Sequence, residues 1–199
     1  MILALNLKRG DLMSVIRNNS SDLRVQKSVK VIKAALLTLI MKKPYKKIRV
    51  DEITKEAMIN RQTFYSHFAS IDNVLEVIGE DMIREMRNGL KALEPADLRG
   101  GVTVFYTYLN TDDPVKQKLF FDKEFTMFFR DFSEKYFSLD FFSSFCGDNE
   151  YSDLVPSFIA NAASGIFKRW RQMPQDRRVG INQLAGDTAD LLMNGLNKI

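Results

Sequence analysis

The sequence predicts an all-α protein of two domains: an N-terminal three-helix domain and a larger C-terminal helical domain. Apolar side chains recur every three or four residues, which places them on one face of a helix. No segment alternates between apolar and polar residues as a half-buried strand does. At 199 residues, with 45% of them hydrophobic, the chain is long enough to bury a substantial core.

The helices of the N-terminal domain follow from apolar spacing and from end signals. Val29, Ile32 and Leu36 share one face of the first helix, which Pro44 stops. Asn60 is expected to cap the third helix by accepting a backbone hydrogen bond. The expected helices span about residues 24–41, 50–57, 61–67 and 72–93. Residues 1–23 are interpreted as a flexible or weakly helical extension.

The C-terminal domain is expected to contain at least four further helices, and Gly100 and Gly101 are expected to mark a break between elements within it. Pro114 and Pro156 lie in first turns, and Pro174 ends a helix. The expected spans are about 102–110, 114–132 or beyond, 156–173 and 176–197, with a shorter aromatic piece at 136–146. The predicted domains are therefore 1–23, 24–71 and 72–199.

The charge of the chain is distributed unevenly. Residues 24–49 contain nine Lys or Arg and no acidic residue. Residues 24–72 carry eleven bases and four acids, a net charge of +7, while residues 73–199 carry −4. A basic region on an acidic body is typical of a protein that presents one end to a polyanion such as DNA. The alternative is a solvated helix face.

Residues 51–72 carry the most informative pattern, a short helix, a tight turn and a second short helix. This arrangement can place the second helix in the major groove of duplex DNA. Arg61 and Gln62 begin that helix and can pair with the edges of guanine and adenine, respectively. The side chains expected to contact phosphate oxygens are Lys46, Lys47, Arg49, Thr63, Tyr65 and His67.

Residues 29–77 resemble the DNA-binding head of the tetracycline-repressor (TetR) family of bacterial regulators. The resemblance lies in AAL at 34–36 and IRVDEITKEAMINRQTFYSHF at 48–68, of which TFYSHF is the most specific part. It implies that Arg61 and Gln62 face bases and that Phe64 and Phe68 belong to the core. It also implies a ligand-responsive homodimer, by default a repressor, that binds a pseudo-palindromic site.

Three positions depart from the family pattern. Met58 occupies a turn position that is often glycine, where a left-handed backbone would be strained. Arg49 stands where Ser or Thr often caps the second helix, and Ile71 stands where a lysine often anchors phosphate. These departures favour one alternative, a protein-interaction or adaptor module of the same fold that has lost specific DNA binding.

Residues 120–145 contain eleven aromatic side chains, which can be interpreted as core packing or as a chamber for a small apolar or aromatic effector. The predicted pocket residues are Tyr106, Phe121, Phe125, Phe128, Phe129 and Phe132, with Tyr108 and Thr126 as further polar contacts. The last two helices are expected to form the dimer seam. The predicted seam residues are Phe158, Ile159, Ala162, Ile166, Trp170, Leu184 and Leu192.

Other classes find no support in the sequence. No stretch approaches the roughly 20 apolar residues of a membrane helix. No Gly-rich phosphate loop, CxxC, HExxH or GxSxG motif occurs, and His67 is the only histidine, so we expect no catalytic residue, metal or cofactor. Cys146 is the only cysteine, and no flanking cation favours a redox role. One thiol and no export signal predict a cytoplasmic protein.

Overall fold

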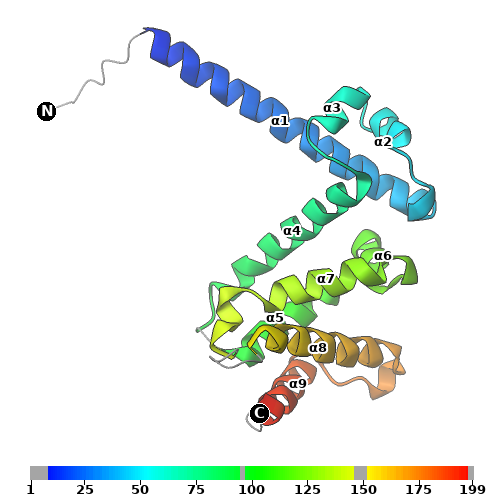
Figure 1. Cartoon of the computed structure of the whole chain (residues 1–199). Coiled ribbons are helices and arrows are strands. Elements are labelled where there is room, and N and C mark those ends of the chain that lie inside the picture. Colours follow the sequence, from blue (N-terminus) through cyan, green and yellow to red (C-terminus); the bar gives the residue numbers. More distant parts are fainter. Residues whose placement is uncertain (1–8, 95–96, 146–151, 197–199) are drawn as a thin grey trace, which may run out of the picture. The chain divides into compact units, whose positions relative to one another are not determined.

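The structure is a computed structural model that describes residues 9–94, 97–145 and 152–196. Within these ranges every regular element is a helix and no strand is present, as predicted (Figure 1). The chain divides into two compact units, Met1–Leu75 and Glu76–Ile199. No helix among the described residues is both long and apolar enough to cross a membrane.

The first unit contains three helices and the start of a fourth. In Figure 1, α2 and α3 lie next to each other on one side of α1, and both contact it. Apolar side chains from all four helices form the core. The elements are α1 (Arg9–Lys42), the 3-10 turn η1 (Tyr45–Lys47), α2 (Val50–Glu56), α3 (Arg61–Tyr65) and α4 (Ile71–Leu90), which continues into the second unit.

The first helix begins earlier than predicted, at Arg9 rather than near Arg24. Residues 11–43 contain neither proline nor glycine, so nothing in this stretch interrupts a helical backbone. Pro44 follows the end of α1 as expected. Residues 1–8 of the predicted extension lie outside the described part of the chain.

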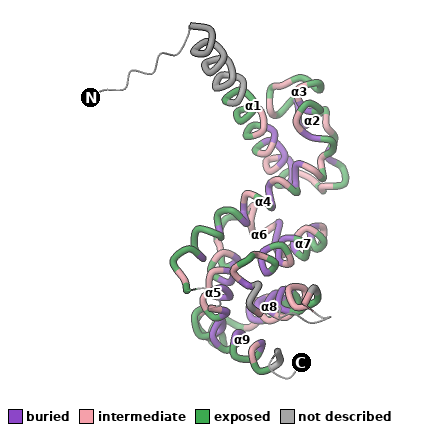
Figure 2. The backbone as a smooth tube through the Cα atoms, turned by 60° about the vertical axis from the view of Figure 1, so that its left-hand side comes forward, coloured by how far each residue is buried: buried purple, intermediate pink, exposed green. Residues whose placement is uncertain are grey.

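The second unit is built from helix pairs. Helix α5 packs along α9, and α7 packs along α8. Figure 2 shows that buried residues recur along these helices. The helices are α5 (Leu98–Leu109), α6 (Pro114–Phe121), α7 (Thr126–Phe137), α8 (Val155–Gln172) and α9 (Ile181–Leu196), with 3-10 turns η2 (Lys123–Phe125), η3 (Asp140–Phe145), η4 (Ser152–Leu154) and η5 (Gln175–Arg177).

Gly100 and Gly101 do not separate elements, contrary to the sequence-based expectation, because both lie inside α5. The helix begins three residues earlier than Gly101, where the Asp97 side chain accepts a hydrogen bond from the Gly100 backbone at 2.8 Å. A Cβ atom at Gly101 would lie 2.5 Å from the Phe142 ring. The glycine at this position therefore allows close packing rather than a turn.

Two predicted helices are wrong at their boundaries. The helix expected over 114–132 is interrupted at Asp122, whose backbone is extended and whose side chain accepts a hydrogen bond from the Glu124 N–H at 2.9 Å. Aspartate favours such caps because its short carboxylate reaches nearby backbone donors. The last helix begins at Ile181, after Gly180, and not at residue 176. Cys146 lies outside the described residues.

Candidate nucleic-acid interface

The turn between α2 and α3 has the geometry of a tight helix-turn-helix. Met58 adopts a φ of 53°, and it is the one non-glycine residue with positive φ in the described part of the chain. Its side chain is 93% exposed. Asn60 caps α3, because its side-chain oxygen accepts from the Thr63 backbone N–H at 2.7 Å. The cap predicted from the sequence is confirmed, and it fixes where α3 begins.

Helix α3 divides into a buried and an exposed side. Phe64 and Phe68 are buried in the core, as the sequence predicted. Arg61, Gln62 and Tyr65 are exposed. The ring of Tyr65 stands edge-on to that of Phe64, with 5.3 Å between the ring centres, so it is partly packed while 52% of the residue remains accessible. The exposed start of α3 is thus held in place by the buried side of the same helix.

Two of the residues predicted to contact phosphates are less exposed to solvent than the others. Thr63 is half-buried, and its hydroxyl donates a hydrogen bond to the Asn60 side chain at 2.9 Å. That hydroxyl must rotate before it can donate to a phosphate oxygen, because it carries only one proton. His67 is also half-buried, and its backbone N–H donates to the Phe64 carbonyl at 3.0 Å.

The linker before α2 carries the other predicted phosphate contacts. Lys46 and Lys47 are exposed in the turn η1, and Arg49 is exposed at the N-cap of α2. An arginine side chain has no acceptor, so Arg49 cannot cap as Ser or Thr would. Instead, Glu52 accepts from the Arg49 backbone N–H at 3.0 Å. A hydrogen bond from Lys43, and then this one, hold the pKa of the Glu52 carboxyl below its usual value.

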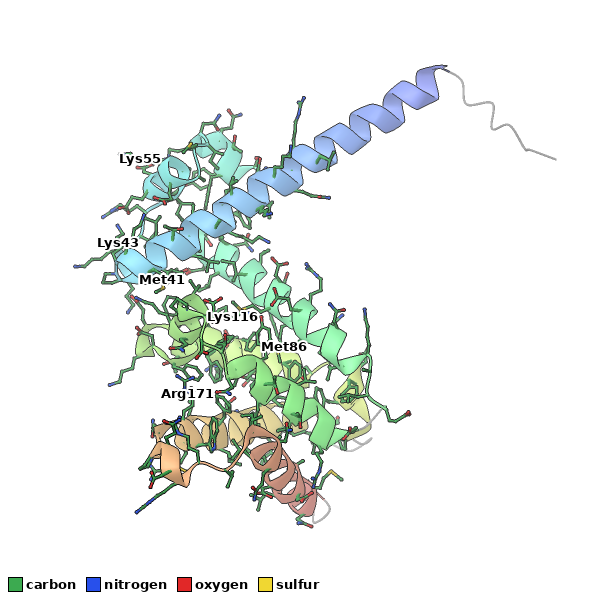
Figure 3. The ribbon with its side chains drawn as sticks, turned by 180° about the vertical axis from the view of Figure 1, so that it is seen from behind. Met41, Lys43, Lys55, Met86, Lys116 and Arg171 are labelled. Atoms are coloured by element: carbon green, nitrogen blue, oxygen red, sulfur yellow. The ribbon has the colours of Figure 1, made fainter. Side chains whose placement is uncertain are left out.

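All four acidic residues between 24 and 72 are engaged inside the first unit. Three of them pair with a base, from α1, from α3 or from Lys43, which directly follows α1 and is labelled in Figure 3, and the fourth accepts from a tyrosine hydroxyl. The contacts are Arg61 to Asp51 at 3.1 Å, Lys43 to Glu52 at 2.5 Å, Lys42 to Glu56 at 3.3 Å, and the Tyr45 hydroxyl to Asp72 at 2.5 Å. These four acids offset only part of the positive charge of residues 24–72, which keep a net charge of +7.

Comparison with known proteins agrees with this geometry. Residues 32–78 match the family described as bacterial regulatory proteins, tetR family. The HTH-type dhaKLM operon transcriptional activator DhaS of Lactococcus lactis subsp. lactis (strain IL1403) is 32% identical over 152 residues, which cover 71% of this chain and 79% of DhaS. The chain belongs to the TetR family. It is therefore a DNA-binding transcriptional regulator, not an enzyme.

The fold was also compared with solved structures. A TetR transcriptional regulator from Streptococcus agalactiae 2603V has a TM-score of 0.61 and 20% sequence identity, covering 88% of this chain and 98% of its own. A structure described as the dihydroxyacetone kinase operon activator DhaS has a TM-score of 0.48 and 25% identity, covering 86% of this chain and 97% of its own. The first of these supports the TetR fold for both units.

The aromatic residues predicted to line an effector pocket pack mainly against one another. Tyr106, Phe125, Phe129 and Phe132 are buried, whereas Phe121 and Phe128 are half-buried. The Tyr106 hydroxyl lies 3.0 Å from both the Ala163 carbonyl and the Thr188 hydroxyl, and burial raises its pKa. This arrangement matches the core-packing interpretation of the sequence.

A pocket of about 480 Å³ opens between α4, α5 and α6. The Tyr108 hydroxyl donates to Glu85 at 2.7 Å, and Lys116 lies 3.3 Å from the same carboxylate. Burial, and then the bond to Glu85, raise the pKa of Tyr108. Met86 and Lys116, which both line this pocket, are labelled in Figure 3. The lining residues are Glu85, Met86, Gly89, Thr103, Val104, Thr107, Tyr108, Asn110, Thr111 and Lys116.

The sequence pointed to Tyr108 but not to Glu85 or Lys116. These two residues lie 31 positions apart on different helices, and neither belongs to a local motif. No signal in the sequence links them, because their meeting depends on how α4 and α6 pack. The chemistry of the pocket is accordingly more polar than the phenylalanine chamber that the sequence suggested.

The residues predicted for a dimer seam divide into two groups. Ile159, Trp170, Leu184 and Leu192 are buried inside the protomer, so in this structure they contribute little area to a partner. Phe158 is 46% exposed, and Ala162 and Ile166 are half-buried. Together with exposed Gly165, these last residues occupy one outward face of α8, because they lie four, seven and eight positions apart.

Proposed function

We propose that this TetR-family regulator binds a pseudo-palindromic DNA site as a homodimer and represses transcription from it. The observation that carries the proposal is the exposed start of α3, held by the Asn60 cap and by buried Phe64 beside the basic linker. In this proposal Arg61 and Gln62 read bases, while Lys46, Lys47, Arg49, Thr63, Tyr65 and His67 hold phosphates.

Dimerisation is part of the same proposal. Two copies of α3 must reach half-sites about one helical turn, roughly 34–36 Å, apart on one face of the duplex. The outward face of α8 that contains Phe158, Ala162, Gly165 and Ile166 offers a self-complementary surface for a twofold contact.

A small-molecule effector would act through the second unit. The pocket between α4, α5 and α6 lies beside the C-terminal half of α4, the helix whose first turn belongs to the DNA-binding unit. An effector with different affinity for two positions of this helix would change DNA binding by that difference. The hydroxyl, amide, carboxylate and ammonium groups of this pocket suit a small polar molecule better than a purely apolar one.

Activation is the second candidate, because the relative DhaS is named as a transcriptional activator. Repression and activation differ in where the site lies relative to the promoter, and both need the same DNA contacts. An adaptor role without DNA binding is the alternative that Met58, Arg49 and Ile71 raised.

The experiment is selection of bound DNA from a random pool with the purified full-length protein. We expect a two-fold symmetric motif with half-sites about one turn apart. Arg61→Ala should cost about 1–3 kcal/mol at the selected site and relax the preference at one position in each half-site. Lys47→Ala is the matched control: it should weaken all sequences alike and lower the salt dependence by about one phosphate contact.

The outcomes separate the candidates. No enrichment from the pool, with the protein folded, would support the adaptor. An Arg61→Ala variant that selects the same motif with the same discrimination would contradict the base-reading role. A reporter gene downstream of the selected site then distinguishes repression from activation by the sign of its response.

A further inference from the structure

The ion pair between Arg61 and Asp51 connects the two helices of the helix-turn-helix at the point where DNA is expected. The Nε atom of Arg61 lies 3.1 Å from Oδ1 of Asp51. Both side chains are well exposed, at 63% and 64% respectively, so the pair lies on the surface and not in the core. Arg61 is the first residue of α3, and Asp51 lies in the first turn of α2.

The choice of nitrogen in this pair matters for base reading. An arginine reads guanine with two parallel N–H bonds from one planar guanidinium group. Because Asp51 lies beside the Nε atom in this ion pair, the two terminal nitrogens keep their four N–H groups for other partners. The ion pair also favours one orientation of the guanidinium group, so less side-chain freedom remains to be lost on binding than for an isolated arginine.

We propose that Asp51 is a positioning residue that orients the Arg61 guanidinium for base recognition and so sets the specificity of this protein. The inference rests on the base-reading role proposed above for Arg61. It adds a residue on α2 that has no base contact of its own.

Charge explains why this arrangement has a cost. Asp51 places a carboxylate within a strongly basic surface, where it repels the phosphates of any DNA sequence. Its removal should therefore raise affinity for random DNA while it lowers discrimination at the base that Arg61 reads. An acid whose only role is to suit the N-terminus of α2 would affect stability instead.

The test compares Asp51→Ala with Glu56→Ala in the full-length protein. Glu56 is a second exposed acid of α2 and pairs with Lys42, so its removal changes the same charge without touching Arg61. Affinities are measured for the selected site, for the site mutated at the Arg61-dependent position, and for random DNA. Asp51→Ala should lower the ratio of matched to mismatched affinity about fivefold, whereas Glu56→Ala should leave this ratio unchanged.

Both variants should bind random DNA about two- to threefold more tightly, since each removes one negative charge near the phosphates. Asp51→Asn should retain part of the discrimination, because its amide oxygen keeps a partial negative charge beside the Arg61 guanidinium. In an Arg61→Ala background, Asp51→Ala should change the matched-to-mismatched ratio no further.

The two proposals fail in distinguishable ways. If Arg61→Ala leaves base preference intact, the base-reading role of Arg61 is wrong. If Arg61→Ala relaxes one position while Asp51→Ala keeps the full matched-to-mismatched ratio, the positioning role alone is overturned. A loss of binding to all sequences alike, together with a lower Tm, would assign Asp51 a structural role and would also overturn it.

Discussion

At the scale of single residues, Met58 is the clearest departure from local preference. It holds a left-handed backbone with φ of 53° in the turn between α2 and α3. A β-carbon in this conformation costs about 1–2 kcal/mol, which glycine avoids. The side chain is almost fully exposed, so burial returns little of that energy. The turn nevertheless keeps this conformation, because the helices on its two sides are fixed by fully buried Ile53 and Phe64.

Met58→Gly should therefore stabilise the protein. Relief of the backbone strain is partly offset by the greater freedom of glycine in the unfolded chain, about 0.4–1 kcal/mol. We expect a net gain of about 0.5 kcal/mol in the free energy of unfolding, measured by urea denaturation. Met58→Ala is the control: it keeps the β-carbon and should change stability little. An equal gain in both variants would show that the side chain, and not the backbone, is unfavourable.

At the scale of elements, the sequence located the helix-turn-helix to within two residues. Helices α2 and α3 were predicted over about 50–57 and 61–67, and they span Val50–Glu56 and Arg61–Tyr65. Their limits depend on caps and turn residues that act over four positions or fewer. The errors fall where side chains from distant helices meet, as at Gly101, or where an aspartate interrupts an apolar run, as at Asp122.

Gly101 provides a test at this scale. Alanine normally favours a helix over glycine by up to about 1 kcal/mol. At Gly101 the new Cβ would meet the buried Phe142 ring, so Gly101→Ala should instead destabilise the protein by about 1–3 kcal/mol. Gly165→Ala is the matched control when both variants are made in the Phe158→Asp background, which removes the proposed contact face: within the protomer its Cβ would have nothing within 4 Å and should stabilise α8. Thermal unfolding at one protein concentration checks both variants, and stabilisation by Gly101→Ala would contradict the packing at α5.

At the scale of the whole molecule, the proposed dimer requires an apolar surface that each protomer leaves exposed. The protomer leaves Phe158 46% exposed on α8 and Leu191 66% exposed on α9. Exposed apolar side chains that share a helix face with small residues are typical of surfaces that bind a partner. The buried group of predicted seam residues instead supports the helix pairs inside each protomer.

A charge placed on that face should separate the subunits. Phe158→Asp should shift the protein from dimer to monomer, because a carboxylate buried at a twofold contact faces its own copy. Light scattering coupled to size exclusion gives the mass directly. Met127→Asp is the control, since Met127 is similarly exposed on α7, away from the proposed contact face. A dimer that persists in Phe158→Asp would place the contact elsewhere.

The sequence by itself determined the helical class, the helix-turn-helix and the Asn60 cap, because each depends on spacing and hydrogen bonds within a few residues. Only the tertiary structure decided that Asp51 meets Arg61 and that Glu85 meets Tyr108 and Lys116. The tertiary structure also decided which apolar face of α8 remains exposed to solvent. These outcomes depend on how separate helices pack, and packing between distant segments has no periodic signature in the chain.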